Sequence, residues 1–552
     1  MKKDTSELAG YVLERFERYK EGRKPFEERW EEAYYNTIGE YSPSVQGQWR
    51  GREATGSKLF VRLTRHKVRT ASRHLEPALR QLRFDLRGEA GDERALSELK
   101  AEIERILSFA RAADHLVDMA WEGAWSGTGI LRVPVLAERA ETVFEIDSAT
   151  KLWTASAEKR PYPAVRNVPL WNFYPDPDSG NVEEGEGVIE LHRLYPHQLR
   201  AMVGRAGWDF AAVEALVKEG DTSSEERWES SLRSAVGGSF GADSKKLRVL
   251  EYWGVVPASL LKKAGIELPE GAGEDVEALV IASNGRVLKC SPNPWVPAMR
   301  PYLRFRWEPV PHQFWGVGVA ENIRDSQKMI NGATRLLVDN KALAGNCMFE
   351  IDAEALVPGQ DLSTVYPGKK WVLRPGAAGP AVRPVPVPDV SPVLIEMINL
   401  FTAFADETSG VAIGLDSADA LGSQTATGLS IAQSAALEGY RSIIRRIDDE
   451  VIEPMIERIY RWLMEYGDTA LPKAPARVRA VSQTATQAKE LRSQRLMEFI
   501  NLLGGGFGGL PANPSEETLA GKIDLGRVLE ELADTLEVRE IIKTKGGADG
   551  HR

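Results

Sequence analysis

The chain has 552 residues, of which 43% are hydrophobic and 27% charged, and its formal net charge is -10. This length exceeds what one hydrophobic core can organise, so we expect about two to four domains or packed layers. The composition is that of a folded globular protein, and the negative charge argues against a protein that binds nucleic acid by neutralising its phosphates.

Neither a disulfide framework nor a membrane span is indicated. The two cysteines, Cys290 and Cys347, lie far apart and in no metal-ligand spacing. No apolar run approaches the roughly 18 residues that a spanning helix needs, and the first residues, MKKDTSELAG, lack the apolar segment of a signal peptide. We therefore expect a protein without a membrane segment that is made in a cytoplasm.

The N-terminal part is predicted to be helical and is followed by an α+β region. Apolar residues recur at helical spacing before and after Pro25, and further helices are expected near Phe60–Leu86 and from Glu93 to about Trp125. Between Gly129 and Pro301, β-branched residues alternate with polar ones. The expected elements are strands at Ile130–Val135, Thr142–Ile146, Val188–His192, Leu247–Val255 and Ala278–Leu288, a helix near His197–Gly204, and an exposed insertion around Asp221–Ser244.

Two helices enclose a small Pro/Gly-rich segment in the next part of the chain. The helix Val319–Ala344 carries Ile323, Ile330 and Leu337 at seven-residue intervals on an otherwise polar surface. Such a stripe suits a helix that packs along one seam, although an ordinary surface helix explains it as well. Short strands such as CMFEI and KKWVLRP are expected within Asn346–Pro392, and the helix Val393–Thr408 follows.

A long connection of small residues comes next. The segment Gly410–Ser430, GVAIGLDSADALGSQTATGLS, contains no lysine, arginine or aromatic residue, and loops of this length are usually functional or disordered. The longest helical pattern, about Leu429–Tyr466, runs through Pro454, where we expect a kink. Amphipathic helices are expected again after Ser482.

Motifs that resemble catalytic or ligand-binding sites are better explained structurally. GREATGSK (Gly51–Lys58) has the glycine interval of a phosphate loop but the order Ser-Lys instead of Lys-Ser. WGVGVAEN lacks the third glycine of a dinucleotide fingerprint, which favours a glycine-mediated entry into a helix. DPDSGNVEEGE (Asp176–Glu186) misplaces the glycine of a calcium loop, which favours a surface turn. We expect no catalytic residue, no metal and no cofactor.

The basic segment Lys58–Arg87 is the strongest positive field in the sequence. It could meet nucleic acid. Pairing with acidic surfaces of the same chain, within or between subunits, is the favoured interpretation.

From Pro311 onward the chain resembles the portal proteins of tailed bacteriophages, particularly those of short-tailed phages. The likeness is carried by HQFWGVGVAENIRDSQKMINGATRLLVDNKALAGN, the β segment and helix after it, and TATGLSIAQSAALEGYRSIIRRIDDEVIEPMIERIYRWLMEYG. Two earlier stretches, EGAWSGTGILRVPV and VPLWNFYPDPDSG, are similar to the wing region of the same family. The order of these elements is more telling than any one of them.

The resemblance implies a predominantly helical α+β portal fold with wing, stem, clip and crown. The implied divisions are 1–310 wing, 311–345 stem helix, 346–392 clip, 393–409 second stem helix, 410–430 tunnel loop, 431–481 long kinked wing helix, and 482–552 crown and tail.

The resemblance also implies site residues. In the DNA-facing tunnel loop these are Asp416, Ser417, Asp419, Ser423, Gln424 and Thr425. In the subunit interface of the stem they are Ile323, Ile330 and Leu337, and in the clip facing terminase or adaptor they are Asp361, Lys369, Lys370 and Trp371.

The implied partners are other subunits in a ring, usually dodecameric, double-stranded DNA in its channel, the large terminase subunit, tail adaptors, and the major capsid and scaffolding proteins. The expected location is the portal vertex of the virion, after assembly in the host bacterial cytoplasm. The alternative is a structural head-to-tail adaptor or another ring-forming virion protein.

Overall fold

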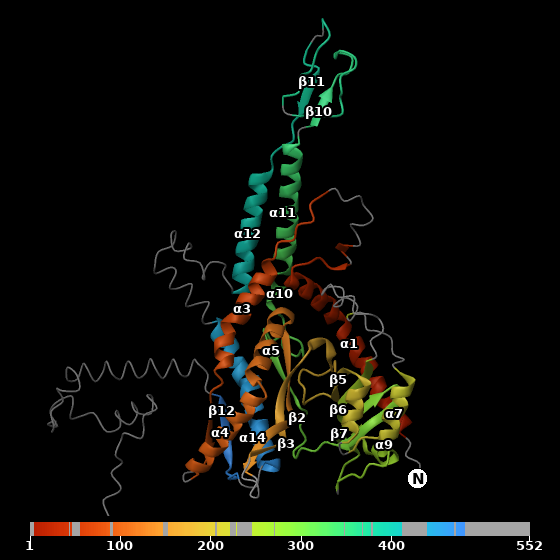
Figure 1. Cartoon of the computed structure of the whole chain (residues 1–552), viewed down its shortest axis with the longest axis vertical. Coiled ribbons are helices and arrows are strands. Elements are labelled where there is room, and N and C mark those ends of the chain that lie inside the picture. The colour runs from red at the N-terminus through yellow and green to blue at the C-terminus, as the bar shows by residue number, and fades with distance from the viewer. Residues whose placement is uncertain are drawn as a thin grey trace, which may run out of the picture. The chain divides into compact units, whose positions relative to one another are not determined.

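The computed structural model describes residues 5–43, 45–46, 56–88, 92–146, 153–204, 207–220, 228, 246–269, 271–346, 348–366, 368–376, 379–410, 439–467 and 471–480. Helices and strands are mixed along the chain, which confirms the predicted α+β class (Figure 1). Contacts divide the chain into two units. The first comprises residues 1–76, 114–135 and 165–439, and the second residues 77–113, 136–164 and 440–552.

A five-stranded antiparallel sheet, of order β4-β5-β6-β7-β8, and the helix α1 (Ser6–Ile38) form the main core of the first unit. Leu8, Val12, Phe16 and Tyr19 recur every three or four positions of α1 and are at most 1% exposed, because this stripe packs against the sheet. The strands are β4 (Phe173–Pro175), β5 (Gly187–Leu194), β6 (Leu247–Pro257), β7 (Asp275–Ser283) and β8 (Arg286–Pro292), accompanied by α6 (Pro196–Val203), α7 (Phe210–Glu219) and α9 (Ala258–Lys263).

The helix α1 continues through Pro25 as one element of 33 residues. An internal proline removes one backbone hydrogen bond, and buried contacts on both sides compensate here. The side chain of Arg23, 1% exposed, donates hydrogen bonds to the backbone oxygens of Trp171 and Phe173 at 2.9 and 2.8 Å. On the other side, the ring centroid of Trp30 lies 5.8 Å from that of Trp171.

A second, three-stranded sheet has the order β3-β2-β9, and the helix α5 (Ala112–Ser126) leads into it. Its strands are β2 (Thr128–Ile146), β3 (Trp153–Val168) and β9 (Tyr302–Arg306), and a short 3-10 helix, η1 (Leu170–Asn172), follows β3. Gly127 joins α5 to β2 at a φ of 92°, and a Cβ at this position would lie 2.2 Å from the backbone oxygen of Gly316. Gly318 is the N-cap of the next helix, which confirms the predicted entry into a helix, and the WGVGV glycines also allow a close approach of the backbone to Gly127.

Two helices lie side by side and carry a small β segment beyond their ends (Figure 1). The order is α10 (Val319–Asn322), α11 (Arg324–Gly345), β10 (Met348–Ile351), β11 (Val382–Val385) and α12 (Ser391–Ser409). The strands β10 and β11 pair antiparallel, from Met348 opposite Val385 to Ile351 opposite Val382. The expected strand KKWVLRP is wrong, because among its residues only Leu373 forms an isolated bridge, to Leu356.

The second unit combines a two-stranded sheet with helices. The strand β1 (Phe84–Gly88) pairs antiparallel with β12 (Ala476–Ala480), and the helices are α4 (Glu93–Phe109), helical residues 439–447, the π-helix η3 (Asp448–Ile452) and α14 (Glu453–Tyr466). The π-helix lies directly before Pro454, whose ring would clash with the backbone oxygen four residues earlier in a regular α-helix. The helix α3 (Leu63–Arg80) begins in the first unit and ends in the second.

Residues with positive φ divide two of the predicted elements. The helix expected from Glu93 to Trp125 is α4 and α5, separated at Arg111, which has a φ of 49°. The strand expected at Ala278–Leu288 is β7 and β8, joined by Asn284 and Gly285 with φ values of 47° and 72°. Positive φ at both positions is the geometry of a tight type I′ hairpin turn.

Candidate functional site

The hairpin of α11 and α12 exposes many large apolar side chains. On α11 these are Met329, Leu336, Val338 and Leu343, and on α12 they are Val393, Ile395, Leu400 and Phe404. Leu336 is 59% exposed and Val393 66%. Scattered apolar residues are normal on a protein surface, but eight on two adjacent helices indicate a surface that contacts another protein.

The predicted seam residues of α11 do not all face outward. Ile323 and Ile330 are 0% and 2% exposed, because they pack inside this subunit, and Leu337 is partly buried. Two of the three residues in the seven-residue stripe therefore pack the helix against its own chain. Exposed apolar residues beside that stripe, such as Leu336, are better placed to meet a neighbour.

Buried polar contacts fasten α11 and α12 to the start of α3 and the residues just before it, and the sequence analysis missed them. The side-chain oxygen of Gln327, which is 0% exposed, accepts hydrogen bonds from the backbone nitrogen and the hydroxyl of Thr64 at 2.9 and 2.8 Å. The backbone nitrogen of Val61 donates to Asn331 Oδ1 at 2.9 Å. Lys67, also 0% exposed, forms an ion pair with Asp406 of α12.

Three of the four residues predicted for the clip lie together in one loop. The Nζ atom of Lys369 lies 4.1 Å from the ring centroid of Trp371 and donates a hydrogen bond to the backbone oxygen of Asp361. Hydrogen bonds from Ser363 hold the pKa of the Asp361 carboxyl below its ordinary value. Lys370 is exposed beside them, as is Tyr366, so the loop presents charges and aromatic rings to solvent.

Several predicted segments lie outside the described residues. They are most of the tunnel loop, including Asp416, Ser417, Asp419, Ser423, Gln424 and Thr425, the insertion Asp221–Ser244 apart from Trp228, and the crown 482–552.

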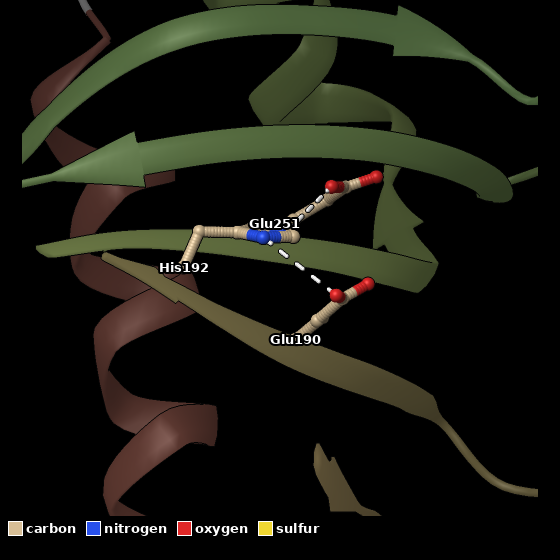
Figure 2. A group of neighbouring side chains, drawn as sticks. All are labelled: Glu190, His192 and Glu251. Carbon is tan, nitrogen blue, oxygen red and sulfur yellow. Dashed lines mark hydrogen bonds and ion pairs between the residues drawn. The ribbon is translucent and has the colours of Figure 1, made fainter. Parts of the chain in front are cut away.

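A buried charge cluster joins the two sheets of the first unit, and sequence reasoning did not find it. Glu190 and His192 lie two residues apart on β5, and Glu251 lies opposite Glu190 on β6. Figure 2 shows the imidazole of His192 between the two carboxylates, with Nε2 at 2.8 Å from Glu251 Oε2 and Nδ1 at 3.6 Å from Glu190 Oε1. Each of the three residues has one oxygen or nitrogen atom within 4.8 Å of such an atom on the other two, a spacing that also suits a metal ion.

Arg132 of β2 supplies the positive charge in this cluster. Its Nη1 donates to Glu190 Oε2 at 2.7 Å and to Glu251 Oε2 at 2.9 Å, and its Nη2 donates to Glu251 Oε1 at 2.5 Å. Burial alone would raise the pKa of Glu251, but the charge of Arg132 and the hydrogen bond from His192 hold that pKa well below its ordinary value. Both carboxylates are therefore compensated by the guanidinium, and the cluster fastens β2 to β5 and β6.

The two other acidic or phosphate-loop-like segments are also occupied by protein contacts. Arg18 of α1 lies 3.5 Å from Asp176 and 3.0 Å from Glu186, and it also pairs with Asp178, which supports the interpretation of DPDSG as a turn. In the described end of GREATGSK, the backbone nitrogen of Ser57 donates to Asp339 Oδ1 at 2.7 Å. A carboxylate thus accepts the hydrogen bond that a phosphate would accept in a phosphate loop.

Glu122 of α5 makes stability depend on pH near neutrality. It is 7% exposed, and burial raises its pKa to about 7, although hydrogen bonds from the backbone of Leu170 and the side chain of Asn167 oppose the shift. The folded state therefore holds a proton that the unfolded state has already lost, so stability is present at low pH and falls as the pH rises from about 4.5 to 7.

We expect Glu122→Gln to remove this pH dependence and to raise the free energy of unfolding at pH 8 by about 1–3 kcal/mol. Glutamine keeps an acceptor for the Leu170 nitrogen, and its amide can donate to Asn167 Oδ1, a buried atom with no hydrogen bond, once the Asn167 amide is turned. Denaturant unfolding at pH 5 and pH 8 measures the effect, with Glu17→Gln at an exposed position of α1 as the control. An unchanged difference between the two pH values would refute the assignment.

Among the described residues, no helix combines the length and the apolar character needed to cross a lipid bilayer. What the fold presents is a mixed α+β chain with an exposed apolar helical hairpin, as in a protein that assembles with others.

A family model described as the Phage SU10 portal protein matches residues 133–471, which is more than half of the chain. The chain matches no curated protein. The chain belongs to the Phage SU10 portal protein family, which confirms the resemblance seen in the sequence and makes it a bacteriophage portal protein and a component of the virion.

Proposed function

We propose that the chain forms a closed ring around a channel at one capsid vertex, through which double-stranded DNA is packaged and later ejected. Membership of a portal family supports the role, and the exposed apolar surface of α11 and α12 is the observation that carries the ring. In a ring each subunit meets the next through two different surfaces, and the rotation closes the assembly. Apolar side chains on the hairpin would be covered by the adjacent subunits.

The parts of the chain take their roles from this arrangement. Residues 1–310 and 431–481 form the wing, 311–345 and 393–409 the stem, 346–392 the clip, and 482–552 the crown and tail. The clip residues Asp361, Lys369, Lys370 and Trp371 meet the large terminase subunit during packaging and a tail adaptor afterwards. Capsid and scaffolding proteins contact the ring as it is built in the host cytoplasm.

The loop Gly410–Ser430 lines the channel in this proposal. Each lysine or arginine would replace a counterion of the DNA with a direct phosphate contact and would strengthen binding. The loop has no lysine or arginine and contains Asp416 and Asp419, so it can touch a moving polyanion without holding it. The net charge of -10 agrees with weak binding of DNA.

Electron microscopy of the purified protein tests the proposal directly. We expect rings with a central hole wide enough for duplex DNA, with dodecamers as the main species. Compact monomers at all protein concentrations, in the presence and absence of scaffolding protein, would contradict the ring and favour the adaptor role.

A further inference from the structure

The helix α3 has a buried apolar face and an exposed basic face. Val68, Ala71 and Leu75 are 0% exposed, so this side of the helix is fixed in the core. Arg65, Arg69 and Arg73 follow one another at four-residue intervals and are all exposed. Because residues four apart lie on the same side of a helix, the three guanidinium groups form one stripe, which we call the arginine face.

The arginine face has no acidic partner among the described residues. The carboxylate that reaches α3, Asp406, pairs with the buried Lys67 instead. Like charges four residues apart on a helix destabilise it by about 0.2–0.5 kcal/mol per pair. An acidic surface placed against the arginine face would remove this repulsion.

A groove of complementary charge lies between α1 and α11. It has a volume of about 490 Å³ and is lined by four glutamates, Glu28, Glu31, Glu32 and Glu40, together with Lys328 and Arg335. Lys328 pairs with Glu32 at 2.7 Å, which leaves the groove with more carboxylates than cations. We call this hollow the acidic groove.

Tyr35, which also lines the acidic groove, experiences its negative charge. Burial and the negative charges of Glu31 and Glu40 raise the pKa of Tyr35 to about 12. Glu28 and Glu40 are exposed, and neither side chain pairs with a cation in the part of the chain that the structure describes. The groove can therefore accept positive side chains from outside the subunit.

We propose that in the ring the arginine face of one subunit docks on the acidic groove of the next. Figure 1 shows α3 and α1 diverging to opposite sides of α10, and a head-to-tail ring needs two different surfaces that face different neighbours. The inference rests on the proposed ring and names a second contact in it, separate from the apolar hairpin. A complementary surface on the same chain favours a second copy over DNA as the partner, since the net charge of -10 opposes binding of a polyanion.

Charge reversal tests the contact. We expect Arg69→Glu with Arg73→Glu to raise the protein concentration needed for half-assembly by at least about tenfold at low salt, because two positive charges in each contact are replaced by two negative ones. Glu28→Lys with Glu40→Lys should have a similar effect. The chain that carries all four substitutions should assemble again, because the two surfaces are exchanged but remain complementary.

The matched control is Lys218→Glu with Lys262→Glu, which changes the net charge equally at exposed lysines on α7 and α9. Light scattering measures assembly, and thermal unfolding checks that each subunit is folded. If both the wild type and the arginine variant form normal rings, this contact is refuted and the proposed ring stands. If the wild type forms no rings, the proposed function itself is refuted. Normal assembly with reduced binding of duplex DNA by the arginine variant would assign the arginine face to DNA instead.

Discussion

Replacing Arg132 by methionine should lower the free energy of unfolding by about 3–5 kcal/mol at pH 8. The guanidinium donates to both Glu190 and Glu251, whose side chains are 2% and 8% exposed. Without Arg132 the two buried carboxylates keep hydrogen bonds from Tyr302, Trp253 and His192 but lose the guanidinium that compensates their charge, and desolvation of an uncompensated charge is costly. Denaturant unfolding of wild type and variant measures the difference.

The pH dependence of this loss distinguishes charge from packing. In the wild type the pKa of Glu251 is held low, so its contribution to stability is present above the unfolded pKa and is lost only in strong acid. In the variant burial dominates and raises the pKa of Glu251, so the variant takes up a proton there and its deficit should shrink towards pH 5. The chain with Arg132→Met, Glu190→Gln and Glu251→Gln should recover much of the loss. A deficit that is equal at pH 5 and pH 8 would mean that Arg132 acts through packing alone.

Local patterns predicted most helices and strands. The errors lie where contacts with distant residues, or a turn that was missed, determine the bounds of an element. Helical spacing before and after Pro25 did not tell whether one helix continues through the proline, and contacts with Trp171 and Phe173, far along the chain, stabilise the continuous helix. The division of β7 from β8 was available in the sequence, because Asn284-Gly285 is a strong hairpin signal. A propensity argument could not foresee the π-helix, although Pro454 marks its place.

The buried charge cluster shows what a single sequence leaves out. Glu190 and His192 are two residues apart in IELHRL, so the sequence already places them on the same face of a strand. Their partners Arg132 and Glu251 lie on other strands, and only the pairing of β5 with β6 brings Glu251 opposite Glu190. The arginine face of α3 was visible as a basic segment, but its exposed side and the acidic groove required the packed structure.

A stripe of apolar residues does not say which chain covers it. Ile330 and Leu336 are both apolar residues of α11, yet Ile330 is 2% exposed and Leu336 is 59% exposed. The first is covered by its own subunit, and the second is left for a neighbour. The same substitution at the two positions should therefore have opposite consequences for folding and assembly.

Leu336→Asp combined with Leu400→Asp, which places one charge on each helix of the hairpin, should abolish rings while the subunit stays folded. Both side chains are more than half exposed, so the free energy of unfolding should change by less than about 1 kcal/mol. In the ring the aspartates would be desolvated against apolar side chains of the adjacent subunit, at every contact around the ring. Negative-stain images and light scattering measure assembly.

Ile330→Asp provides the comparison, because it buries an unpaired charge inside the subunit. It should lower the free energy of unfolding by about 4 kcal/mol or more, and rings should be lost only because the chain unfolds. Asn399→Asp adds a charge at an exposed polar position beside Leu400 and should leave both folding and rings unchanged. If the variant with Leu336→Asp and Leu400→Asp forms rings at the same protein concentration as the wild type, the exposed side of the hairpin meets solvent in the assembly. The subunit contact would then have to lie elsewhere, with the arginine face and the acidic groove as its first candidates.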